Sequence, residues 1–92
     1  MDLAKLIRLC VENGVKRLAV FGSTARGEAT PESDLDLLVE FSGPKSLLAL
    51  VALERQLSEA LGQEVDLLTE AALSPYLRDA IRQEARVLYE AG

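Results

Sequence analysis

The sequence has no histidine, and this absence excludes several kinds of chemistry at once. Without an imidazole there is no Ser-His-Asp triad, no Cys-His nucleophile and no ordinary zinc site. The single cysteine, Cys10, cannot form an internal disulfide, so the cytoplasm is the expected compartment. A bound metal ion would have to accept oxygen ligands alone, which favours Mg²⁺ or Mn²⁺.

Basic charge, aromatic residues and long apolar runs are also scarce. The formal net charge of −5 argues against a protein that binds long nucleic acid by itself, because such affinity rests on basic surface. Only 4% of the residues are aromatic, so the chain offers no stacking platform for bases. No apolar run approaches the ~20 residues of a membrane span, and no signal peptide is visible. At 92 residues and 49% hydrophobic content, we expect one domain, residues 1–92, with a modest core.

Apolar periodicity predicts an α/β protein with helices and short strands in alternation. Asp2 caps the first predicted helix, and Asn13-Gly14 ends it. Strands are expected over residues 15–21, 34–41 and 64–68, and a short edge strand over 87–89. The buried side of the first helix would carry an i, i+3, i+4, i+7, i+8 pattern: Leu3, Leu6, Ile7, Cys10 and Val11.

Two further helices are predicted in the second half of the chain. The first covers residues 46–61, ends at Gly62 and carries leucines on more than one side, which predicts that it is covered on two sides. The second begins with Ser74-Pro75 as N-cap and first helical residue, and it ends near Glu84. Its inward residues are expected to be Leu77 and Ile81.

The chemistry of the chain concentrates in residues 20–41. The first strand delivers the backbone to Gly22-Ser23, where a glycine turn, free N–H groups and a hydroxyl could bind phosphate. Asp34 and Asp36 follow in the next predicted strand, on one face and roughly 6.5–7 Å apart at Cα. Carboxylates at that spacing can converge on one cation, or on two cations about 4 Å apart.

Asp36 and Asp66 each stand alone among apolar residues of a strand. An unpaired charge in such a place costs several kcal/mol. The plain structural alternative is that arginines satisfy these two acids and that Asp34 caps a turn. We favour the metal site because three acids and a glycine turn occur together. Arg26 could neutralise a triphosphate, or it could pair with Glu28 or Glu32, and this choice stays open.

Three other motif readings fail on single features. Gly22 and Gly27 have the spacing of a P-loop, but Glu28-Ala29 stands where Lys-Ser/Thr is required. A calcium loop starting at Asp34 would need a glycine where Leu37 to Val39 stand. A glycosidase acid pair would leave the glycine turn without a role.

With these residues in hand, the chain resembles the minimal nucleotidyltransferases, a family of the polymerase-β-type nucleotidyltransferase superfamily. The resemblance covers nearly the whole chain, and the combined motif is highly specific. The positions that carry it are Gly22-Ser23, Arg26-Gly27, Ser33-Asp34, Asp36, Asp66 and the tail of residues 82–90, RQEARVLYE.

The resemblance implies an α/β domain with a small mixed sheet and a two-metal transfer of NMP, most readily AMP from ATP. Gly22 and Ser23, with Arg26 beside them, would bind the triphosphate, while Asp34 and Asp36 would bind the metal ions. Asp66 would complete the catalytic metal site and help deprotonate the acceptor hydroxyl. Phosphoryl transfer depends mainly on positioning and charge neutralisation, which this set of groups can supply.

The resemblance also implies a helical partner of the HEPN type in a toxin–antitoxin pair, with adenylylation of a partner tyrosine. Two other functions stay open at this point. One is an antitoxin that binds nucleotide or covers its partner without catalysis. The other is transfer to a small molecule such as an aminoglycoside. The acid triad favours the enzyme, because a pure binder has no need of three costly carboxylates. The chain is also short for a second cleft wall, which points to a partner that supplies one.

Overall fold

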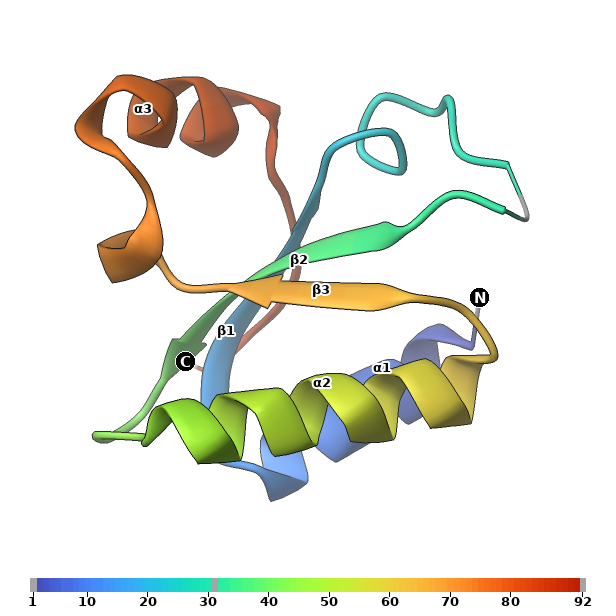
Figure 1. Ribbon diagram of the computed structural model, residues 1–92, viewed down its shortest axis with the longest axis vertical. Coiled ribbons are helices and arrows are strands. Elements are labelled where there is room, and N and C mark those ends of the chain that lie inside the picture. The colour runs from blue at the N-terminus through green and yellow to red at the C-terminus, as the bar shows by residue number, and fades with distance from the viewer. Residues whose placement is uncertain (1, 31, 92) are drawn as a thin grey trace.

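A mixed four-stranded sheet organises the protein, as the computed structural model shows (Figure 1). The structure describes residues 2–30 and 32–91, so Met1 and Gly92, the ends of the predicted domain, lie outside the described residues. The elements in chain order are α1 (Leu3–Glu12), β1 (Val15–Phe21), β2 (Leu35–Phe41), α2 (Leu47–Leu61), β3 (Val65–Leu68), the 3-10 helix η1 (Glu70–Ala72), α3 (Pro75–Glu84) and β4 (Arg86–Glu90).

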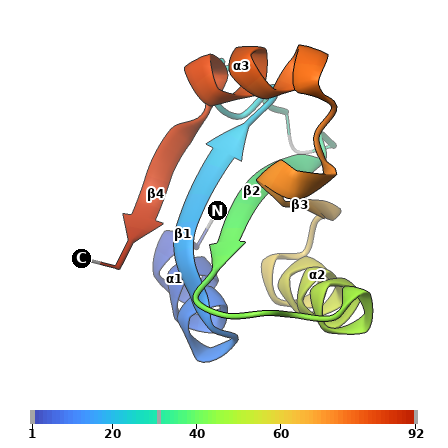
Figure 2. The same cartoon turned by 90° about the vertical axis from the view of Figure 1, so that its left-hand side faces the viewer.

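The strand order is β3-β2-β1-β4. β1 runs antiparallel to both β2 and β4, whereas β2 and β3 run parallel. The parallel pair needs a crossover connection, and α2 supplies it. Helices α1 and α2 lie on one face of the sheet, and α3 lies on the other (Figures 1 and 2). The predicted α/β fold with a mixed sheet is therefore confirmed.

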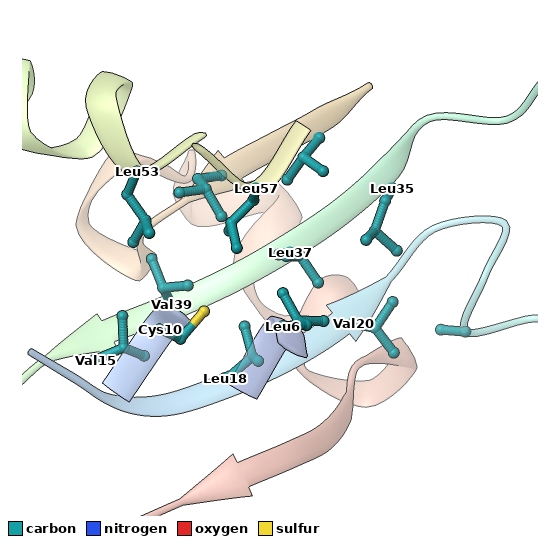
Figure 3. Packing of buried hydrophobic residues seen from close by; sticks show 13 residues of the cluster. Leu6, Cys10, Val15, Leu18, Val20, Leu35, Leu37, Val39, Leu53 and Leu57 are labelled. Atoms are coloured by element: carbon teal, nitrogen blue, oxygen red, sulfur yellow. The ribbon is translucent and has the colours of Figure 1, made fainter. Parts of the chain in front are cut away.

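The main core lies between the sheet and the pair α1 and α2 (Figure 3). Leu6 and Cys10 of α1 and Leu53 and Leu57 of α2 are fully or almost fully buried there. They pack on the residues of β1 and β2 that point to this face, which include Leu18, Val20, Leu35, Leu37 and Val39. Burial raises the pKa of the Cys10 thiol to about 11, which fits its predicted place in the core.

A smaller apolar cluster lies on the opposite face of the sheet. Ala19, Phe21 and Leu38 of the sheet meet Leu73 there, and Ile81 of α3 packs against them. Because side chains alternate along a strand, the residues between the main-core positions point to this thinly covered face. Asp36, which lies between Leu35 and Leu37, is one of them.

The edge strand β3 is shielded by side chains of α2. The hydroxyl of Ser58 accepts a hydrogen bond from the backbone N–H of Val65 at 3.1 Å. The carboxylate of Glu54 accepts one from the N–H of Leu67 at 2.8 Å. These bonds satisfy donors that an uncovered sheet edge would leave unpaired.

Local signals located the elements well, with small shifts at their ends. The N-caps Asp2 and Ser46 accept bonds from Lys5 and Ala49, and Gly62 ends α2 in the left-handed region. β2 and β3 each begin one residue later than predicted, β4 is longer than its predicted range, and η1 was not anticipated. No helix in the described ranges is both long and apolar enough to cross a membrane.

The predicted burial of several apolar residues is wrong. Leu47 and Leu48 are 74% and 81% exposed, so α2 is covered on one side only. Leu3, Val11 and Leu77 are exposed as well. Leu3 and Val11 belong to the predicted buried stripe of α1, and Leu77 to that of α3, so the described chain covers these stripes only in part. Periodicity indicates which residues can be buried together, and it does not establish that a covering layer exists.

Candidate active site

Asp36 and Asp66 are brought together by the parallel pairing of β2 and β3. The two residues are register partners, since Leu35 pairs with Val65 and Asp36 with Asp66. Neighbouring strands lie about 4.8 Å apart, so the two carboxylates start from adjacent backbone positions on the same face. Asp34 is exposed and immediately precedes β2, so it lies two residues before Asp36 but outside the strand in which it was predicted.

The carboxylate of Asp36 carries an unfavourable charge. Burial raises its pKa above the ordinary value, and repulsion from Asp66, Asp34 and Glu84 raises it further, while Arg26 lowers it. None of the ion pairs found within residues 2–30 and 32–91 includes Asp34, Asp36 or Asp66. No arginine therefore forms an ion pair with Asp36 or Asp66 within the described residues, which speaks against the alternative in which arginines satisfy these two acids.

Gly22 lies in direct proximity to the Asp36 carboxylate. It follows the last residue of β1, Phe21, which is the register partner of Asp36 in β2. Its φ of +72° belongs to the left-handed region that glycine adopts readily. A Cβ built at this position would overlap Asp36 Oδ2, so a larger residue would displace the carboxylate. The predicted glycine turn at Gly22 and the predicted acid Asp36 are thus in direct contact.

The residues after Gly22 form a compact turn. The N–H of Arg26 donates to the carbonyl of Gly22 at 3.2 Å, and the N–H of Glu28 donates to the carbonyl of Ser23 at 2.8 Å. We call residues 22–28 the glycine loop. It holds Gly22, Ser23 and Arg26 within one turn of backbone, next to the acids. A short loop of this kind can present N–H groups and a hydroxyl to an anion.

Arg26 pairs with two carboxylates from different parts of the chain. Its Nε donates to Glu28 Oε2 at 3.1 Å, and its Nη1 donates to Glu84 Oε1. The sequence suggested the pairing with Glu28 as one possibility, whereas it did not suggest Glu84. Two features of the sequence could have indicated Glu84. It belongs to the tail motif of residues 82–90, and it is an acid at the end of a predicted helix, where the helix dipole disfavours negative charge.

The three carboxylates are ligands that a hard divalent cation prefers, although they do not form a complete coordination site in this structure. Within residues 2–30 and 32–91, no three acidic or thiol side chains are grouped closely enough to form a metal site. Asp36 nevertheless lies beside two other acids and lacks an ion-pair partner among the described residues, and a cation with oxygen ligands would relieve that repulsion. The metal ligands Asp34, Asp36 and Asp66 therefore remain a prediction.

The acids lie at the end of the sheet where β1 ends and β2 begins. A hollow of about 240 Å³ is bordered by Arg17, Glu70 and Arg82 near α3. Another of about 530 Å³ lies between η1 and the start of α2. Neither hollow contains an acid of the candidate site or a residue of the glycine loop. That a partner forms the second wall of the cleft stays a prediction.

Comparison with known proteins places the chain in a family. Residues 3–88 match the nucleotidyltransferase domain model, so the chain belongs to the nucleotidyltransferase domain family. A candidate protein adenylyltransferase of Methanocaldococcus jannaschii is 51% identical to the chain over 81 residues, covering 88% of this chain and 87% of the relative. The resemblance seen in the sequence is confirmed.

Two solved structures support the fold and the family. A candidate minimal nucleotidyltransferase is 42% identical, with a TM-score of 0.78 and coverage of 94% of this chain and 95% of its own. A toxin–antitoxin complex with AMP-PNP contains a chain that is 25% identical, with a TM-score of 0.87, covering 99% of this chain and 75% of that one.

Proposed function

We propose that this member of the nucleotidyltransferase family transfers AMP from ATP to a hydroxyl group of a helical partner protein of the HEPN type. The observation that carries the proposal is the register pairing of Asp36 with Asp66, directly beside Gly22. It places two carboxylates against a turn that can bind phosphate. The name of the M. jannaschii relative supports adenylyl transfer, and the AMP-PNP complex supports ATP as substrate within a toxin–antitoxin pair.

Each residue of the site has a distinct part in this reaction. Gly22 and Ser23 present backbone N–H groups and a hydroxyl to the triphosphate, and Arg26 adds positive charge at the rim. Asp34, Asp36 and Asp66 would hold Mg²⁺ or Mn²⁺. When bound, the metal ions neutralise the charge that develops on the phosphates and orient the reacting oxygens.

The transfer itself exchanges one bond to phosphorus for another. The acceptor oxygen forms a bond to the α-phosphorus, and the bond from that phosphorus to the bridging oxygen of the β-phosphate breaks. Pyrophosphate leaves, and the proton of the acceptor hydroxyl passes to Asp66. Asp66 suits this role because it lies on the strand next to Asp36 while remaining partly exposed.

A partner protein would supply the second wall of the site and the acceptor. The two hollows described above lie away from the acids, and the relative that is solved with AMP-PNP is part of a toxin–antitoxin complex, which supports a partner as the second wall. We expect tyrosine as the acceptor, before serine or threonine. We also propose that residues 1–92 act as one domain and that the pair works in the cytoplasm, where a single thiol stays reduced.

Co-expression with a helical protein encoded by the neighbouring gene tests the proposal. The complex should copurify, and mass spectrometry after incubation with ATP and Mg²⁺ should find AMP on the partner. Replacing Asp34, Asp36 and Asp66 by Asn should abolish the modification, whereas Glu59→Gln, an exposed acid of α2, should preserve it. Copurification without any AMP would favour an antitoxin that only covers its partner. Rapid transfer to a free small molecule would overturn the partner proposal.

A further inference from the structure

We propose that Glu84 is a latch on the nucleotide site: in the free protein it holds the Arg26 guanidinium, and the triphosphate must replace it there. The inference rests on the proposed function, because it assumes that a triphosphate binds at the glycine loop. It assigns a role to the tail motif of residues 82–90, which the reaction described above leaves without one.

The Arg26–Glu84 contact joins parts of the chain that are remote in sequence. Arg26 belongs to the glycine loop after β1, whereas Glu84 is the last residue of α3, 58 positions further on. Figure 2 shows α3 lying across the end of the sheet where β1 ends. Glu84 Oε1 accepts from Nη1 of Arg26 and Glu28 accepts from Nε, so each carboxylate engages one nitrogen of the guanidinium.

The position of Glu84 is unfavourable for the helix that carries it. An acid in the last turn faces the negative end of the helix dipole. Its side chain is 27% exposed, which makes it the more shielded of the two acids that pair with Arg26. Arg26 compensates this charge in the free protein. A residue that served α3 alone would be better as Lys or Gln at this place, so the carboxylate points to a partner outside the helix.

A phosphate group can take the place of Glu84 on Arg26. Phosphate and carboxylate oxygens both match the planar fork of a guanidinium, so they compete for the same N–H donors. The Arg26 side chain is 50% exposed, and pairs that are open to water contribute little to stability, so the exchange is cheap. The backbone bonds of the glycine loop do not involve Glu84, so the loop keeps its shape when the pair opens.

The latch also acts through charge. Glu84 contacts Arg26 of the glycine loop, so a negative charge stands beside the place where a polyanion must bind. While Glu84 is paired with Arg26, the positive charge of the guanidinium is neutralised and does not attract the nucleotide. Once the pair opens, that positive charge can bind a phosphate group. Nucleotide affinity is therefore set partly by how easily this one contact opens.

Calorimetric titration with ATP and Mg²⁺ tests the latch. Glu84→Gln keeps the shape of the side chain but removes its charge, and it should lower the Kd about two- to fivefold, which is the range that an exposed ion pair can supply. Glu59→Gln removes an exposed acid of α2 and should leave the Kd unchanged. In an Arg26→Ala background, Glu84→Gln should have a clearly smaller effect, because there is no guanidinium to release.

The possible outcomes separate the latch from the proposed function. If the unaltered protein binds Mg·ATP and Glu84→Gln binds equally or more weakly, the latch is wrong and the proposed function stands. If the gain persists in full without Arg26, Glu84 acts by direct repulsion and the latch is again wrong. If the unaltered protein shows no binding, both ideas fail. Should Glu84→Gln not fold, Glu84→Asp serves instead, since its shorter side chain weakens the pair and should also tighten binding.

Discussion

Replacing Gly22 with alanine should separate the folding of this protein from its chemistry. An alanine at φ +72° is forced into the left-handed region, which costs about 1–2 kcal/mol. For a domain of this size, such a loss lowers the melting temperature by about 4–16 °C. The added Cβ would also overlap Asp36 Oδ2, the far end of a side chain that can rotate. The carboxylate should therefore move aside without further damage to the fold.

Gly62→Ala is the matched control, since Gly62 has φ +67° and a Cβ added there would meet no atom of the described chain within 4 Å. Both variants should lose similar stability in thermal melts. Only Gly22→Ala should lose AMP transfer, by about 100-fold, because a carboxylate displaced by roughly 1 Å no longer holds its productive position. The transfer is measured well below both melting transitions. Equal activity of the two variants would refute the view that a glycine is required at position 22 to leave room for the Asp36 carboxylate.

Other perturbations test the acids, the glycine loop and the sheet edge. Asp36→Asn should raise the melting temperature, and this gain should grow as the pH rises above the ordinary Asp pKa of 3.8. The reason is that a pKa raised by folding means that ionisation of the carboxyl destabilises the folded state. A gain in melting temperature that stays constant with pH would contradict this prediction. ATP with Mg²⁺ should raise the melting temperature more than ATP with a chelator, and Ser23→Ala should reduce that rise more than Lys45→Ala, in an exposed loop. Glu54→Ala should cost about 1–3 kcal/mol in denaturant unfolding because it leaves a backbone N–H of β3 without its partner, whereas Glu59→Ala on the exposed side of α2 should cost less than about 0.5 kcal/mol.

The elements of this fold were predictable because their signals are local. Asp2 and Ser46 cap helices through bonds to residues three positions away, and Gly62 ends a helix by its own backbone conformation. Strands β1, β2 and β3 are short apolar runs between turns, and their predicted ends are wrong by at most one residue. Such signals depend on a few neighbouring residues, so the sequence carries them directly.

The contacts that define the candidate site were predictable only in part. The sequence indicated Asp36, Asp66 and the glycine turn, but not that Gly22 admits the carboxylate of Asp36. It also indicated Arg26 and its pairing with Glu28, but not its second partner, Glu84. Both contacts depend on strand pairing or on the course of α3 across the sheet, and neither leaves a local pattern. The exposed leucines of α2 show the same limit, since a covering layer is a property of the whole fold.

The backbone ladder, more than any side-chain network, aligns the candidate site. Parallel pairing sets Asp66 beside Asp36, and antiparallel pairing sets the end of β1 beside the start of β2. The leucines that flank Asp36 lie in the main core, so the same burial that stabilises the sheet forces the acid to the opposite face. A one-residue slip of β2 would bury the carboxylate and expose those leucines, and both changes oppose it. The burial of these leucines therefore offsets the repulsion among the acids, and it holds their carboxylates together at the end of the sheet where β2 begins.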